Sequence, residues 1–172
     1  TFRGELGQFF TPRTIVEFMV SVLDPQEGEY ICDPCCGSGG FLIRAFEYVR
    51  EQIETELEQR KEEVKKQLIP ENYDDLKPKE QEAIDAKVSD AFAKMNFEAD
   101  INNAKGRLRS LSFDCIYGTD ANPRMARTAK MNMIMHGDGH GGVHHHDGLL
   151  NVNGIWDGRF DVILTNPPFG AR

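Results

Sequence analysis

The most informative segment of this chain for its fold is YICDPCCGSGGFL, residues 30–42. A short strand-like run at residues 30–32 leads into Asp33, a glycine-rich turn and the start of a helix. Glycine lets the backbone turn sharply and lets a ligand approach closely, and a helix N-terminus presents free N–H groups and partial positive charge. The stretch therefore predicts a ligand-binding turn, with a plain tight connection as the alternative. It lacks the G-x-G-x-x-G spacing, which counts against a nicotinamide cofactor.

Helices and strands alternate on both sides of this turn. Thr11 is expected to cap a helix that has Pro12 at its first position and ends near Asp24. Further elements are predicted as helices at residues 41–53 and 123–137, and as strands at residues 115–120, 143–146 and 160–164. This alternation predicts an α/β fold with a mostly parallel sheet and helices on both faces.

Parallel sheets of this kind bind ligands beyond the carboxyl ends of their strands. Four polar residues fall at those ends: Asp33, Asp120, Asp147 and Asn166. A carboxylate at Asp120 can accept both hydroxyls of a ribose. An N-cap for the helix that opens at Pro123 is the equal alternative for this residue.

The middle of the chain, residues 51–106, has a different composition. Charged residues dominate it, as in EQRKEEVKKQ, and Pro70 and Pro78 interrupt it. Apolar residues at helical spacing from Ile84 to Met95 predict an amphipathic helix. We expect a solvated helical insertion within one catalytic domain that spans residues 1–172, with a partner-binding helical arm as the alternative.

The composition and the net charge argue against several classes of protein. The 172 residues are 40% hydrophobic, with no apolar run near the roughly 20 residues of a membrane span and no secretory leader. The net charge of −8 argues against tight, unaided binding of nucleic acid. Because the first residue is Thr1, we expect the chain to begin inside a longer protein, and the absence of targeting signals favours the cytoplasm.

The cysteines raise a metal or redox alternative. Cys32 and Cys35 form a C-x-x-C pair, and histidines follow at positions 136, 140 and 144–146. Zinc needs four ligands in tetrahedral geometry, and no second cysteine pair exists. The sequence therefore predicts no native metal site, and the cysteine pattern is not that of a secreted disulfide framework.

The segment Asn166-Pro167-Pro168-Phe169 follows the last predicted strand. An Asn side chain has an acceptor oxygen and two amide donors, and proline leaves a carbonyl that only accepts. Two rigid acceptors beside an aromatic ring suit a planar molecule with an exocyclic amino group, such as adenine. A proline-rich strand exit is the structural alternative.

Together, DPCCGSGGFL, TNPPF, GQFFTPR at residues 7–13 and HHHDGL at residues 144–149 resemble the modification subunits of type I restriction–modification systems. This family consists of N6-adenine DNA methyltransferases. The resemblance implies a Rossmann-like methyltransferase fold, truncated here after the fourth strand, and S-adenosylmethionine as the cofactor. It also implies DNA as the substrate, reached through a larger complex with a specificity subunit and a restriction subunit in a bacterial or archaeal cytoplasm. It covers about two thirds of the chain.

The resemblance also assigns roles. Asn166 and the carbonyl of Pro167, followed by Pro168, would accept the N6 hydrogens of a flipped adenine, and Phe169 would stack on it. Asp120 would bind the ribose hydroxyls. The other residues expected to bind the cofactor are Gln8, Phe9, Phe10, Thr11, Pro12, Arg13, Asp33, Pro34, Gly37, Ser38, Gly39, Gly40, Asp147 and Gly148. Two alternatives remain at this point: a protein-glutamine methyltransferase, which typically has tyrosine where Phe169 stands, and a cofactor-binding fragment without activity of its own.

Overall fold

A computed structural model describes residues 10–138, 142–148, 150 and 158–168. The chain divides into two compact units, one made of residues 1–50 and 110–172 and the other of residues 51–109. Among the described residues, no helix combines the length and the apolar character needed to cross a membrane.

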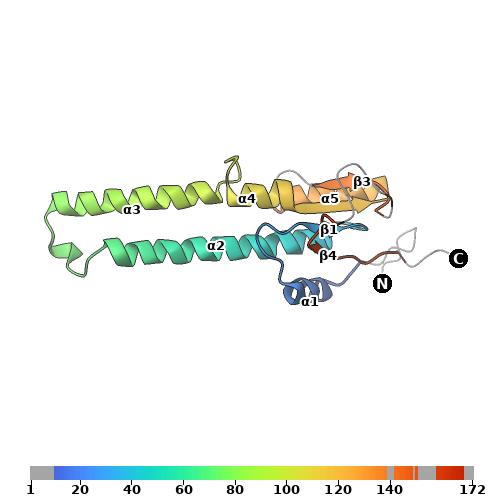
Figure 1. The fold of residues 1–172 in the computed structure, drawn as a ribbon, viewed down its shortest axis with the longest axis horizontal. Coiled ribbons are helices and arrows are strands. Elements are labelled where there is room, and N and C mark those ends of the chain that lie inside the picture. The colour runs from blue at the N-terminus through green and yellow to red at the C-terminus, as the bar shows by residue number, and fades with distance from the viewer. Residues whose placement is uncertain (1–9, 139–141, 149, 151–157, 169–172) are drawn as a thin grey trace. The chain divides into compact units, whose positions relative to one another are not determined.

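Within the described part of the first unit, four strands form one parallel sheet in the order β3-β2-β1-β4. Figure 1 labels β1, β3 and β4. The strands are β1 Ile31–Asp33, β2 Ile116–Asp120, β3 Val143–His145 and β4 Val162–Ile163. Residue Ile31 of β1 pairs with Ile116 of β2 and with Val162 of β4, and Asp120 pairs with His145 of β3. The predicted α/β fold with a mostly parallel sheet is confirmed.

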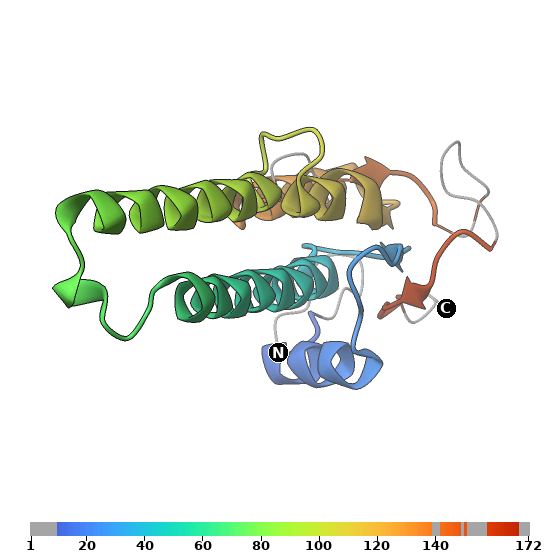
Figure 2. The same ribbon diagram turned by 60° about the vertical axis from the view of Figure 1, so that its left-hand side comes forward.

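Helices α2 (Gly40–Leu68) and α5 (Pro123–Met135) each follow a strand of this sheet. The start of α2 inserts apolar side chains into the core, where Leu42, Phe46 and Val49 are at most 1% exposed. Glu47 and Arg50 of α2 bond to His136, which caps α5, so side chains join the two helices. Figure 2 shows α2, in teal, as one continuous helix. Burying these side chains is the main favourable term in forming the unit.

Helix α1, Arg13–Leu23, differs from its prediction at its start. The capping position is Pro12, and no side chain caps the helix, so the expected N-cap at Thr11 is wrong by one residue. The reason is tertiary, because the Thr11 hydroxyl accepts a hydrogen bond from Asn166 instead. The predicted end near Asp24 is confirmed, with Asp24 in the left-handed conformation that commonly ends helices.

The second unit is helical in its described residues, and α2, whose apolar face to Ile53 was predicted, continues into it without a break. A 3₁₀ turn at Tyr73–Asp75 leads to α3, Pro78–Ala99, which has proline at its first position. The short α4, Arg107–Ser110, and a π-helical turn, Leu111–Cys115, lead back to β2. Met95 is buried, as its helical spacing suggested.

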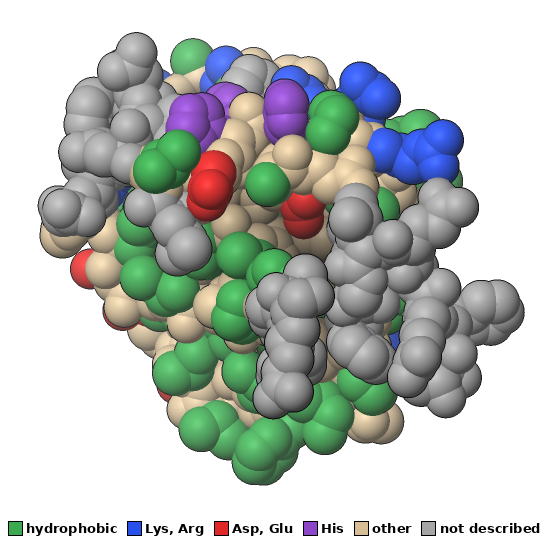
Figure 3. Space-filling model, turned by 90° about the vertical axis from the view of Figure 1, so that its right-hand side faces the viewer, with side chains coloured by type: hydrophobic (Ala, Val, Ile, Leu, Met, Phe, Trp, Pro, Cys, Tyr) green, Lys and Arg blue, Asp and Glu red, His purple; other side chains and the backbone are tan. Residues whose placement is uncertain are grey.

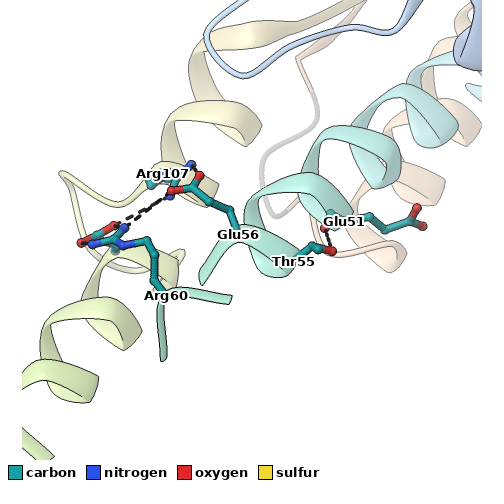
Figure 4. Close-up of polar contacts among 6 residues, drawn as sticks. Glu51, Thr55, Glu56, Arg60 and Arg107 are labelled. Atoms are coloured by element: carbon teal, nitrogen blue, oxygen red, sulfur yellow. Dashed lines mark hydrogen bonds and ion pairs between the residues drawn. The ribbon is translucent and has the colours of Figure 1, made fainter. Parts of the chain in front are cut away.

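Ion pairs join the helices of this second unit (Figure 4). The Arg60 guanidinium donates to both carboxylate oxygens of Glu98, at 2.8 and 3.1 Å, and Arg107 donates to Glu56. These hydrogen bonds lower the pKa values of Glu98 and Glu56. Because the four side chains are 21–51% exposed, each pair stabilises the unit only modestly.

Candidate active site

The glycine-rich turn after β1 is held by backbone hydrogen bonds. The Cys36 N–H donates to the Thr119 carbonyl of β2 at 2.8 Å, and the Gly39 N–H donates to the Cys36 carbonyl at 2.7 Å. Gly39 has φ +88°, and a Cβ there would lie 3.3 Å from the Cβ of Ala129 on α5. Glycine is therefore required at position 39 both for backbone conformation and for helix packing.

The Asp120 carboxylate joins this turn to the end of β2. One oxygen accepts from the Gly37 N–H at 2.9 Å and the other from the Asn122 N–H at 2.8 Å. The N-cap of α5 is Asn122, whose side chain accepts from the Arg124 N–H, so the alternative role of Asp120 as N-cap is wrong. A carboxylate has about four acceptor positions, and two N–H donors leave capacity for ligand hydroxyls.

Asp33 ends β1 and is only 1% exposed. One of its oxygens accepts from the Cys35 N–H at 3.0 Å. Burial raises the pKa of Asp33 to about 6, with a smaller increase from the Asp120 carboxylate and partial offsets from the Cys35 N–H and the nearby Thr165 hydroxyl. That hydroxyl oxygen is itself buried and makes no hydrogen bond of ordinary geometry among the described residues.

The raised pKa of Asp33 predicts a pH-dependent stability. Its ordinary value is 3.8, so the folded state holds the proton more tightly than the unfolded state, and the free energy of unfolding falls as the pH rises from about 4 to about 6. The Asp33→Asn variant lacks this titration and keeps an acceptor for the Cys35 N–H. Its stability relative to the wild type should therefore rise by about 2–3 kcal/mol across that window. Urea unfolding at a series of pH values measures this difference, and parallel curves for the two proteins would contradict it.

The segment after β3 lies against the segment after β1. The Thr119 hydroxyl donates to the Pro34 carbonyl at 2.8 Å. A Cβ on Gly148 would lie 2.1 Å from that carbonyl oxygen and 2.6 Å from the hydroxyl oxygen. The His146 N–H donates to the Asp120 carbonyl at 3.1 Å, and Asp147 is exposed beside it. In Figure 3, acidic side chains lie in a hollow near the centre of the view, below histidine side chains.

Asn166 follows β4 at the same edge of the sheet. The Leu164 N–H donates to the Cys32 carbonyl at 3.0 Å, which continues the pairing of β4 with β1. The Asn166 amide then donates to the Thr11 hydroxyl at 3.1 Å. Pro167 and Pro168 are exposed.

The structure brings together some of the site residues predicted from the sequence and leaves others apart. It brings together Asp33, Pro34, the glycine turn, Asp120 and Gly148, and it joins Thr11 to Asn166. Phe10, Pro12 and Arg13 are exposed before and at the start of α1. Gln8, Phe9 and Phe169 lie outside the described residues.

Sequence reasoning missed several polar residues of this edge. Thr119 and Asn122 flank Asp120, and the Asn122-Pro123 pair carried a local capping signal. Asn132 of α5 donates to the Ser38 carbonyl at 3.0 Å across 94 positions of sequence, and no local pattern marks it. Thr165 is adjacent to Asn166 and was recognisable only by its burial near Asp33.

The cysteines have the wrong environment for a thiolate site. All of them are free, and Cys32, Cys36 and Cys115 are buried. Burial raises the pKa of Cys32 to about 12 and that of Cys115 to about 11, and it also raises the pKa of Cys36. Buried, protonated thiols are poor metal ligands and nucleophiles. In the part of the chain that the structure describes, no three His, Cys, Asp or Glu side chains gather as a metal site.

Comparisons with known proteins show which family this chain resembles. Residues 2–172 match the family model described as N-6 DNA Methylase. The chain is 30% identical over 169 residues to the type I restriction enzyme EcoEI methylase subunit of Escherichia coli, covering 98% of this chain and 24% of the relative.

The chain is also similar to two solved structures of such subunits. A modification subunit from Vibrio vulnificus YJ016 aligns with a TM-score of 0.56 and 30% identity over 98% of this chain and 25% of that one. The type I restriction enzyme EcoKI M protein aligns with a TM-score of 0.55 and 24% identity over 95% of this chain and 26% of that one, which supports the fold alone. The chain therefore spans about a quarter of the length of the relatives it matches.

Proposed function

We propose that this chain, which belongs to the N-6 DNA methylase family, carries the cofactor-binding and catalytic segments of an enzyme that methylates N6 of adenine in DNA. The observation that carries this proposal is the convergence of Asp33, the glycine turn, Asp120 and Asn166 at one edge of a parallel sheet. Such an edge is where open α/β sheets bind their ligands.

The residues of this edge fit S-adenosylmethionine. A Cβ at Gly37 would meet nothing within 4 Å, so the backbone of the turn is open to a ligand there, and Gly148 leaves no room for a side chain against Pro34. The Asp120 carboxylate keeps acceptor capacity for the ribose hydroxyls. The buried Asp33 carboxylate suits the ammonium group of the methionine part, which would lower the pKa of Asp33. When bound, this cofactor supplies an electrophilic methyl group on sulfur.

The chain's own residues would then orient the target base. The Oδ1 atom of Asn166 and the carbonyl of Pro167 would accept the two hydrogens of the adenine amino group. Accepting them raises the electron density on N6 and holds its lone pair toward the methyl group, so much of the catalysis is positioning and electrostatics. The base has to leave the duplex to reach this edge, at a cost of a few kcal/mol.

DNA binding and sequence recognition belong, in this proposal, to a larger complex. The net charge of −8 is unsuited to gripping a duplex alone. We therefore propose a specificity subunit and a restriction subunit as partners, in a bacterial or archaeal cytoplasm. We also propose that the helical segment, residues 51–106, is an insertion in one catalytic domain that spans residues 1–172, in line with the compact unit at residues 51–109.

The proposed activity is tested by incubating the full-length protein and its partners with labelled S-adenosylmethionine and a DNA duplex. Label on adenine is expected, and label on cytosine or on protein would contradict the proposal.

The Asp120→Ala variant tests the cofactor site. It should weaken binding of S-adenosylmethionine by about 1–3 kcal/mol, because the ribose hydroxyls lose their acceptor. The matched control is Asp114→Ala, which removes an exposed aspartate before the opposite end of the same strand and should leave the affinity unchanged. Isothermal titration calorimetry of the full-length protein measures both, and equal affinities would remove Asp120 from the site.

A further inference from the structure

The hydrogen bond between Asn166 and Thr11 joins segments 155 positions apart in the sequence. The Nδ2 group of Asn166 donates to Oγ1 of Thr11 at 3.1 Å in a partly buried position. One end of the Asn166 amide is thus assigned to a partner within the chain. The other end, Oδ1, is the atom to which the proposed function gives the target amino group.

Both partners of this bond stand directly before a proline. A residue before proline is restricted to extended backbone, so Thr11 and Asn166 have few alternative conformations. The Pro12 carbonyl accepts the Ile15 and Val16 N–H groups at 3.0 and 3.1 Å, which ties Thr11 to the start of α1. Asn166 is tied to the sheet two residues earlier, through the bond from Leu164 to Cys32.

The orientation of the Asn166 amide matters for the proposed reaction. An amide turned by half a rotation exchanges its oxygen with its NH₂ group. The turned amide would present donors to an adenine amino group, which is itself a donor, and the interaction would be repulsive. In the observed orientation the Thr11 hydroxyl accepts from Nδ2 and holds the amide in place; because a hydroxyl can also donate, the bond fixes the position of the amide and does not by itself exclude the turned form.

We propose that Thr11 is a positioning residue for Asn166, which holds the side-chain amide in place beside the target amino group. This inference rests on the proposed function and differs from the expected role of Thr11 as a cofactor contact. The hydrogen bond from Asn166 to Thr11 fixes the distance between the two side chains. Pro12 and Pro167, which follow these residues, restrict their backbone.

Methyl-transfer kinetics of the full-length protein with its specificity partner test this role. Thr11→Val keeps the shape of the side chain and removes the hydroxyl, so kcat should fall about tenfold while the affinity for S-adenosylmethionine stays within about twofold. Thr11→Ser restores the hydroxyl and should keep kcat within about twofold of the wild type. The control Thr14→Val makes the same chemical change at an exposed position of α1 and should have no effect. Wild-type kcat in Thr11→Val, or a Thr11→Ser variant as slow as Thr11→Val, would overturn the inference.

Thermal unfolding gives a readout that does not depend on activity. If the two side chains are bonded, the lowering of Tm by Thr11→Val and by Asn166→Ala should be less than additive in the double variant. Additive shifts would overturn the inference even in an active enzyme. A wild-type complex that transfers no methyl group to DNA would instead contradict the proposed function, and the Tm coupling would still decide whether Thr11 holds Asn166.

Discussion

Asn166→Ala is expected to lower adenine methylation by about 10²–10³-fold, the usual effect of removing one group that stabilises developing charge. The affinity for S-adenosylmethionine should stay within about twofold, because Asn166 is assigned to the target base and not to the bound cofactor. In the structure its amide is held at the carboxyl edge of the sheet by Thr11, and Leu164 pairs with β1 just before it. The loss should therefore appear in kcat.

The measurement is transfer of a labelled methyl group to a duplex that carries the target of the specificity partner. Asn72→Ala is the matched control, since it removes an exposed asparagine of the helical unit whose side chain caps nothing. Turnover by Asn166→Ala at the wild-type rate would remove the catalytic assignment and leave the motif as a proline-rich strand exit.

Gly148→Ala is expected to lower the free energy of unfolding by about 3 kcal/mol or more and to abolish measurable cofactor binding. The added Cβ would lie 2.1 Å from the Pro34 carbonyl oxygen and 2.6 Å from the Thr119 hydroxyl oxygen, on the hydrogen bond that joins these residues. Both neighbours stand next to residues assigned to the cofactor, Asp33 and Asp120, and relief of the clash has to move Gly148, Pro34 or Thr119.

Urea unfolding measures the stability change, and calorimetry measures the binding. Gly40→Ala is the control for stability, because a Cβ at Gly40 meets nothing within 4 Å and alanine is a better helix former at the start of α2. It should be as stable as the wild type or slightly more stable. A Gly148→Ala protein of wild-type stability would show that the segment after β3 does not lie against Pro34.

Local chemistry made the framework of this protein predictable from its sequence. The run from Ile31 to the glycine turn and the alternation of strands with helices predicted the parallel sheet, because strand and helix periodicities act over a few residues. The helix start at Pro123 was equally local, although its cap proved to be Asn122. The boundary at Thr11 was wrong because a distant residue, Asn166, competes for the hydroxyl.

Local sequence accounts for the order of the strands and helices, the glycine positions of the turn and the rigid Asn-Pro-Pro exit, since φ preferences and apolar spacing are properties of short segments. Which polar groups meet depends on how the chain folds. The pKa of Asp33 depends on its burial under distant segments, the bond from Gly37 to Asp120 depends on the register of β1 with β2, and the placement of the Asn166 amide depends on Thr11. Desolvation and hydrogen bonding between distant residues arise only when the chain folds, so no local pattern records them.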